Sequence, residues 1–86
     1  MKDLSETVTY MCSDDYKERF LAEYWQTKIR YEKLKKLNYE ISAADITGRE
    51  RPKLTCPVDI LQRQQREMRG YLEILELRAV IEGVKL

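Results

Sequence analysis

The stretch CPVDILQRQQREMRGYLEILELRAVIEG, residues 56–83, decides the fold because it has the features of one complete helix. Pro57 suits an early helical position, and Gly83 suits the left-handed residue that often ends a helix. These features predict a helix from about 57 to about 82, capped by Cys56 or Thr55. Its apolar seam follows helical spacing through Val58, Leu61, Gln65, Met68, Leu72, Leu75 and Ala79.

The same helix carries a second set of apolar residues after Gly70, away from that seam. One neighbouring helix cannot cover residues spread over most of the circumference, so this set must meet the N-terminal segment or another copy of the chain. We expect self-association through it, and Gly70, which costs roughly 1 kcal/mol inside a helix, favours a close helix crossing. The predicted interface residues are Tyr71, Ile74, Leu77, Val80 and Ile81.

A second long helix is predicted upstream. Ser13 can cap free backbone N–H groups, and the acids at positions 14 and 15 suit the positive end of the helix dipole. From there a seven-residue repeat predicts a helix over about 14–44, with the seam Phe20, Tyr24, Thr27, Tyr31, Leu34, Asn38 and Ile41. Among the polar seam positions, Asn38 is expected to fix the register of the helices more readily than to bind a ligand.

These elements together predict the fold class. It is all-α, an antiparallel two-helix hairpin over residues 13–86 with a loop at 45–56, self-associating through its second helix. Residues 1–12 form a short N-terminal extension. In it, the alternation over 7–10 is compatible with an edge strand or with a loose tail.

Composition restricts the class of protein further. A chain of 86 residues, 43% apolar and 36% charged, makes one domain whose own core is marginal, and oligomerisation is a common remedy. It has no apolar run of about 18 residues and no signal-peptide pattern, so we expect a cytosolic protein. Cys12 and Cys56 should be free thiols, because the first helix, about 45 Å long, lies between them.

The sequence contains no histidine, which removes several kinds of catalytic and metal site. No Ser-His or Cys-His pair is possible, two cysteines cannot complete a zinc site, and there is no glycine-rich phosphate loop. We therefore expect no catalytic residues, no metal and no cofactor, and a protein that is not an enzyme.

Charge is distributed unevenly along the chain. Residues 28–53 hold eight basic and four acidic side chains, whereas residues 1–27 hold three and six, so the loop end of a hairpin is basic. An anion site there would use Lys33, Lys36, Arg49, Arg51, Lys53 and Arg63. The alternative is a solvated helix surface. A net charge of +1 argues against binding of duplex nucleic acid.

Two stretches carry a resemblance to a known family. They are SDDYKERFLAEYWQTKIRYEKLKKL from Ser13 and CPVDILQRQQREMRGYLEILELRAVIEGVKL from Cys56. The chain resembles a family of small proteins of temperate phages and prophages of Gram-positive bacteria, labelled after a crAss-like phage relative. The matching positions are Tyr31 to Leu34, Cys56, Pro57, Ile60, Leu61, Gln65, Met68, Tyr71, Leu72, Leu75, Glu76, Arg78, Ala79, Ile81 and Glu82. The resemblance implies a phage setting and assigns no activity.

Small non-enzymatic phage proteins often act on host defence, and some with similar architecture are helical oligomers that sequester nucleotide signals. By this analogy we expect an oligomeric sponge for a cyclic or other small nucleotide. Two alternatives remain open: an inhibitor that docks onto a host defence protein, and a small structural or regulatory phage component.

Overall fold

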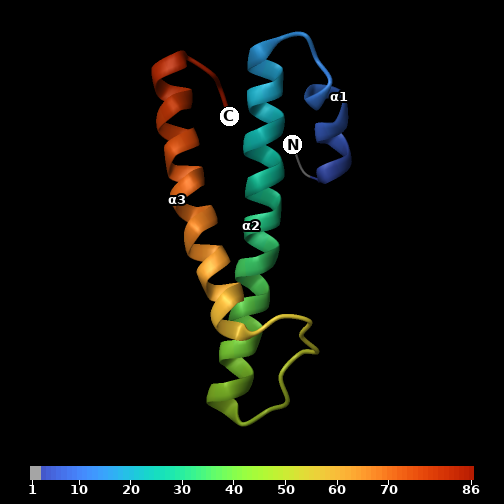
Figure 1. Cartoon of the computed structure of the whole chain (residues 1–86), viewed down its shortest axis with the longest axis vertical. Helices are drawn as coiled ribbons and strands as arrows, with labels where there is room; N and C mark the ends of the chain where they lie inside the picture. The colour runs from blue at the N-terminus through green and yellow to red at the C-terminus, as the bar shows by residue number, and fades with distance from the viewer. Residues whose placement is uncertain (1–2) are drawn as a thin grey trace.

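The computed structural model describes residues 3–86. In chain order the elements are the 3-10 helix η1 (Leu4–Glu6) and the α-helices α1 (Thr7–Met11), α2 (Tyr16–Thr47) and α3 (Val58–Glu82). No strand occurs among these residues, so the all-helical prediction is confirmed. The two long helices α2 and α3 lie side by side and run in opposite directions, and α1 lies against the other side of α2 (Figure 1).

The expected strand or loose tail at residues 7–10 is wrong, because this segment is helical and docked. Asp3 accepts a hydrogen bond from the backbone N–H of Glu6 at 3.2 Å and so caps η1. Thr7 is fully buried; its hydroxyl donates to the Leu4 carbonyl at 2.7 Å and accepts from Gln26 Nε2 on α2 at 3.0 Å. Local capping and one long-range polar contact therefore override the alternating pattern.

The N-terminus of α2 is capped by a different residue from the one predicted. Asp15, and not Ser13, is the N-cap, and its carboxylate accepts from the N–H of Lys17 at 2.9 Å. The Ser13 hydroxyl accepts from the N–H of Asp15 at 3.0 Å and donates to Glu18 at 2.8 Å. The helix ends at Thr47, where Gly48 adopts φ of 70° and its N–H bonds to the Ala44 carbonyl.

Residues next to each end of α3 determine where the helix begins and ends. Pro57 precedes its first residue, and neither Cys56 nor Thr55 is the cap. At the other end Gly83 adopts φ of 70°, which turns the chain back. The N–H of Val84 then bonds to the Ala79 carbonyl at 2.8 Å, and the Val84 side chain is buried. The chain end is thereby folded onto the hairpin core.

The core lies between α2 and α3 along the two predicted seams. Its buried members are Phe20, Tyr24, Tyr31, Leu72, Leu75, Ala79 and Val84, with Leu21, Trp25 and Met68 packed against them. Trp25 meets the Tyr24 ring edge to face, with centroids 5.2 Å apart. Fully burying a large apolar side chain contributes about 1.5–3 kcal/mol, so these few residues supply much of the stability.

Arg78 holds the open end of the hairpin together. Its guanidinium lies 5.0 Å from the centroid of the Phe20 ring, donates to Glu82 at 3.0 Å, and also hydrogen-bonds the Tyr16 hydroxyl. Cys12 and Cys56 are both free. The described part of the chain contains no helix that is long and apolar enough to span a membrane.

Candidate functional site

A groove of about 360 Å³ runs between α2 and α3. Five of its residues share one face of α2 because they are spaced by three or four positions, and five share the adjoining face of α3 for the same reason. We call it the α2–α3 groove; it is lined by Lys28, Tyr31, Glu32, Lys35, Tyr39, Gln65, Arg69, Leu72, Glu73 and Glu76.

In the groove, a lysine ammonium group lies over each of two tyrosine rings. Lys28 Nζ lies 5.8 Å from the centroid of Tyr31, which is buried, and Lys35 Nζ lies 5.8 Å from the centroid of Tyr39. Tyr39 is 64% exposed, so its ring is open to an incoming planar group. A ring beside a cation offers both a stacking surface and a positive charge.

The charges of the groove are partly engaged with one another. Lys28 pairs with Glu32 at 3.1 Å, and Arg69 pairs with Glu73 at 3.4 Å. Within residues 3–86, Lys35 forms no ion pair. Because the two existing pairs join residues four apart on exposed helix surface, each contributes only about 0.3–0.5 kcal/mol. An arriving anion can therefore recruit all three cations at small cost.

A buried polar contact orients one side chain of the groove. Asn38 is only 6% exposed, and its Nδ2 donates to Gln65 Oε1 at 2.7 Å and to the Leu61 carbonyl at 3.3 Å. This bond orients the Gln65 amide, whose N–H groups have no partner among the described residues. The same contact joins the two helices, as expected of a residue that fixes register, while Asn38 Oδ1 is buried without a hydrogen bond.

Glu76 is held at the groove by Tyr24. The Tyr24 hydroxyl donates to Glu76 Oε2 at 2.7 Å. Burial of the phenol, followed by the hydrogen bond and charge of Glu76, raises the pKa of Tyr24 to about 12. Tyr24 therefore stays a neutral donor at physiological pH, and Glu76 stays a fixed acceptor for the hydroxyl groups of a ligand.

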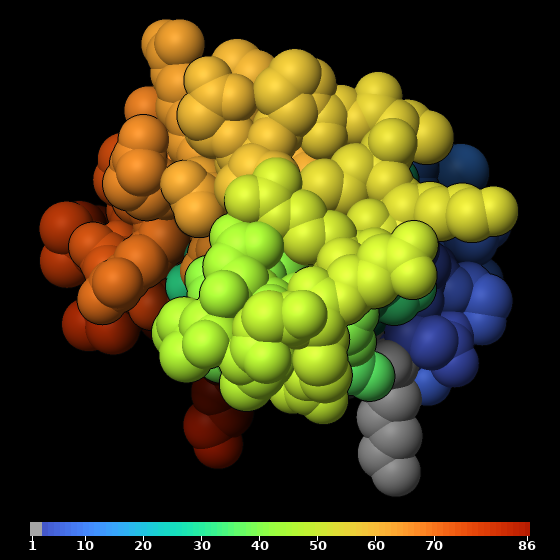
Figure 2. All heavy atoms as spheres, turned by 90° about the horizontal axis from the view of Figure 1, so that it is seen from below, coloured from blue at the N-terminus to red at the C-terminus, as the bar shows by residue number. Residues whose placement is uncertain are grey.

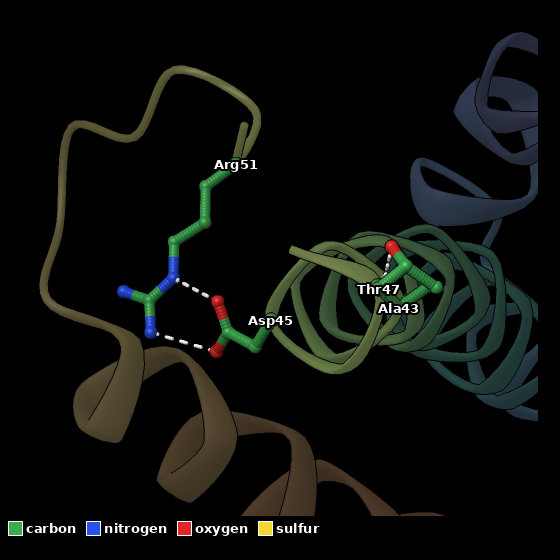
Figure 3. A network of polar contacts seen from close by, with 4 residues as sticks. All are labelled: Ala43, Asp45, Thr47 and Arg51. Atoms are coloured by element: carbon green, nitrogen blue, oxygen red, sulfur yellow. Dashed lines mark hydrogen bonds and ion pairs between the residues drawn. The ribbon is translucent and has the colours of Figure 1, made fainter. Parts of the chain in front are cut away.

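A second hollow of about 400 Å³ lies at the loop end, lined by Glu40, Ala43, Ala44, Arg49, Glu50, Arg51 and Pro52. Figure 2 views the molecule from this end, with the loop residues in lime and yellow over the end of α2. Arg51 binds Asp45 through two hydrogen bonds of 2.7 Å each (Figure 3). These bonds lower the pKa of Asp45. Arg49 Nε donates to the Thr47 hydroxyl at 2.8 Å.

The structure brings together only part of the basic set proposed from the sequence. Arg49 and Arg51 line the loop-end hollow, whereas the other four residues are exposed and line neither hollow: Lys33, Lys36, Lys53 and Arg63. Lys33 lies beside the N-terminal segment. The pKa of Asp3 is lowered mainly by its hydrogen bonds with Ser5 and Glu6, and additionally by the charge of Lys33.

Sequence reasoning missed most of the groove. It placed Tyr31 on the core seam, where its ring is indeed buried, but gave no role to Lys28, Lys35, Tyr39 or Arg69. A signal was present, because Lys28, Lys35 and Tyr39 follow one another at helical spacings of seven and four beside the seam residue Tyr31. Which flank of that seam adjoins α3, and with which partners, depends on how the helices pack.

The described residues contain no cluster of three or more His, Cys, Asp and Glu side chains that could hold a metal ion. No curated protein and no solved structure matches the chain. The profile of a family described as Sequestin matches residues 14–81, which span both long helices and the loop. That description is consistent with a binding protein that sequesters its target. Because the match extends over most of the sequence, the chain belongs to the Sequestin family.

Proposed function

We propose that this protein is a phage-encoded anti-defence protein of the host bacterial cytoplasm that sequesters a small nucleotide immune signal. The ligand lies in the α2–α3 groove, and several copies of the chain assemble into the active sponge. The observation that carries the proposal is the groove itself. An exposed tyrosine ring, an unpaired lysine, an oriented amide and a held carboxylate converge on a space of about 360 Å³.

Each part of a nucleotide finds a matching group there. Lys35 and Arg69 bind the phosphate oxygens, and Tyr39 stacks against the base. The amide of Gln65 donates to an acceptor on the base edge, while Glu76 accepts from a ribose hydroxyl. Binding of this kind withholds the signal from its receptor. The ligand is released unchanged, and no catalytic group is needed.

The loop-end hollow is the weaker site for the same ligand. Arg51 already donates two hydrogen bonds to Asp45, one from Nε and one from a terminal nitrogen, and Arg49 donates one to Thr47. The hollow has no aromatic residue to stack a base, and Glu40 and Glu50 balance its two arginines. A phosphate would have to displace an existing bidentate pair there.

The test compares two double charge reversals by isothermal titration calorimetry with a panel of cyclic and linear nucleotides. Lys35→Glu with Arg69→Glu removes two charge-assisted hydrogen bonds, each worth about 1.5–3 kcal/mol, so affinity should fall by roughly two to four decades. Arg49→Glu with Arg51→Glu is the matched control at the loop end and should bind normally. The reverse pattern would move the site to the loop end.

One observation favours a second candidate function. Several large apolar side chains of α3 are exposed, among them Leu77 and Val80, and such a surface also suits a host defence protein. An inhibitor of that kind would bind one host protein at fixed stoichiometry and ignore every nucleotide of the panel. Native mass spectrometry of protein purified from infected cells separates the two functions, because it reports retained small molecules and retained proteins together.

A further inference from the structure

The outer surface of α3 carries an apolar line that faces away from its own core. We call this line the outer stripe; it consists of Gly70, Ile74, Leu77 and Ile81, spaced by four, three and four residues. Its three large members are 58%, 62% and 73% exposed. At 100° per residue the stripe lies opposite the buried residues Leu72, Leu75 and Ala79.

No other segment of the described chain covers the outer stripe. α3 packs against α2, while α1 packs against α2 and η1 and makes no contact with α3. Figure 1 shows α1 and α3 on opposite sides of α2. Of the two partners predicted from the sequence, the N-terminal segment is therefore excluded over residues 4–11, and another copy of the chain remains.

Gly70 points to a helix as the occupant. Its φ is not positive, and a Cβ built on it would meet no atom within 4 Å, so nothing inside the chain requires glycine there. Glycine is nevertheless among the least favourable residues for a helix interior. In the middle of an apolar stripe it removes the side chain that would keep a neighbouring helix backbone at a distance.

The size of the exposed surface also fits a second copy. The chain has a radius of gyration of 15.7 Å, whereas a compact domain of this length has about 12 Å. Its accessible surface is 6389 Å². A compact monomer of the same mass exposes about 5400 Å². The surplus is close to the roughly 800 Å² that each partner buries in a standard interface.

We infer that α3 pairs with α3 of a second copy through the outer stripe, with Gly70 at the closest approach of the two helices. The pairing also bears on the groove. Glu73 lines the α2–α3 groove and neighbours Ile74 and Leu77 on the helix surface, so a second copy seated on the stripe lies along the rim of the groove. Resting on the proposed function, this predicts that assembly and nucleotide binding reinforce one another.

The first experiment measures mass by size-exclusion light scattering without ligand. The wild type should be at least a dimer at 50 µM or below, and Ile74→Glu with Leu77→Glu should be a folded monomer by circular dichroism. Val8→Glu with Ile46→Glu replaces two apolar residues off the stripe that are 57% and 84% exposed, and should keep the wild-type mass. A monomeric wild type, or loss of assembly in the control alone, overturns the inference.

The second experiment uses Gly70→Leu, which keeps the test decisive if the charged variant unfolds. Leucine is a better helix former than glycine, and a Cβ at position 70 meets no atom of the single chain, so the thermal midpoint of the monomer should rise. Association should nevertheless weaken by at least tenfold in sedimentation equilibrium. Unchanged or tighter association would show that the helices do not approach closely at Gly70.

The third measurement separates this inference from the proposed function. Nucleotide affinity, measured by calorimetry, should fall at least tenfold in the monomeric variant, although every groove residue is intact. Assembly without nucleotide binding in the wild type would contradict only the proposed function. Nucleotide binding by a wild-type monomer would contradict the pairing and the assembled sponge, but not the nucleotide site in the groove.

Discussion

The inner and outer surfaces of α3 have nearly the same composition and opposite surroundings. Leu75 is fully buried against α2, and Leu77, two residues further along, is 62% exposed. Both have the same helix propensity and the same transfer free energy, so residue type does not distinguish them, and only their positions on the helix circumference do. What differs is the presence of a neighbouring helix. The apolar content of a helix therefore measures how many partners it needs, and only one partner lies within this chain.

The largest expected effect is on the free energy of unfolding, when the buried and the exposed leucine are each shortened to alanine. Leu75→Ala should reduce the free energy of unfolding by about 2–5 kcal/mol, because it leaves a cavity in the closed seam. Leu77→Ala should change it by less than about 0.5 kcal/mol in the dissociated chain. Urea denaturation followed by circular dichroism at low and high protein concentration measures both. Equal losses at low concentration would mean that the outer stripe is packed within the single chain.

The second-largest effect is expected from the hydrogen bond between Tyr24 and Glu76. Tyr24→Phe removes the hydrogen bond to Glu76 and should cost about 1–2 kcal/mol at neutral pH. The folded chain raises the pKa of Tyr24 from 10.0 to about 12. The stability that the neutral Tyr24 hydroxyl contributes is therefore complete below pH 10 and is lost as the pH rises through 12.

Ultraviolet absorbance of the tyrosinates checks this second prediction. A tyrosine step should appear near pH 12 in the wild type, and that step should vanish in Tyr24→Phe. A wild type without a step near pH 12 would contradict the contact.

A smaller effect of opposite sign is expected on the outer surface. Gly70→Ala should raise the free energy of unfolding of the dissociated chain by about 1 kcal/mol, because alanine forms helix better and meets no atom there. Thermal unfolding at low concentration measures the gain, and a loss would show that an atom of the chain fills the space beside Gly70.

The smallest effect concerns the ion pair between Arg69 and Glu73. Both side chains are well exposed, at 72% and 65%. Glu73→Gln should therefore change the free energy of unfolding by at most about 0.5 kcal/mol, and less in high salt. A chemical denaturation series at two salt concentrations provides the measurement. A change above 1 kcal/mol would mean that Glu73 has a buried role.

The two ends of the chain show where local reasoning succeeded and failed. Gly83 was expected to end the second helix and does so in the left-handed conformation. The reason is local, since only glycine adopts that geometry without strain. The strand or loose tail at residues 7–10 failed, because the helix depends on the Thr7 side chain reaching Gln26, nineteen positions away. No window of sequence contains that contact.

The candidate site shows the same division. Cationic and aromatic residues were recognised, but the loop-end set was chosen from charge density along the chain. The groove instead joins Lys35 and Tyr39 of α2 with Gln65 and Arg69 of α3, which are far apart in the sequence. Arg51, a member of the proposed set, turned out to be bound to Asp45. Pairing of charges depends on distance in space, which charge counts do not contain.

By itself the sequence determined the all-helical class, the two long helices and the residues of their seams, because helical periodicity, breakers and caps act over one or two turns. The tertiary structure alone decided which flank of the seam became a groove, where the N-terminal segment docked, and that no other described segment covers the apolar line predicted outside the seam of α3. Each of these depends on the rotation and register of one helix against another. Those variables are set by the packing of side chains that come together only when the chain has folded.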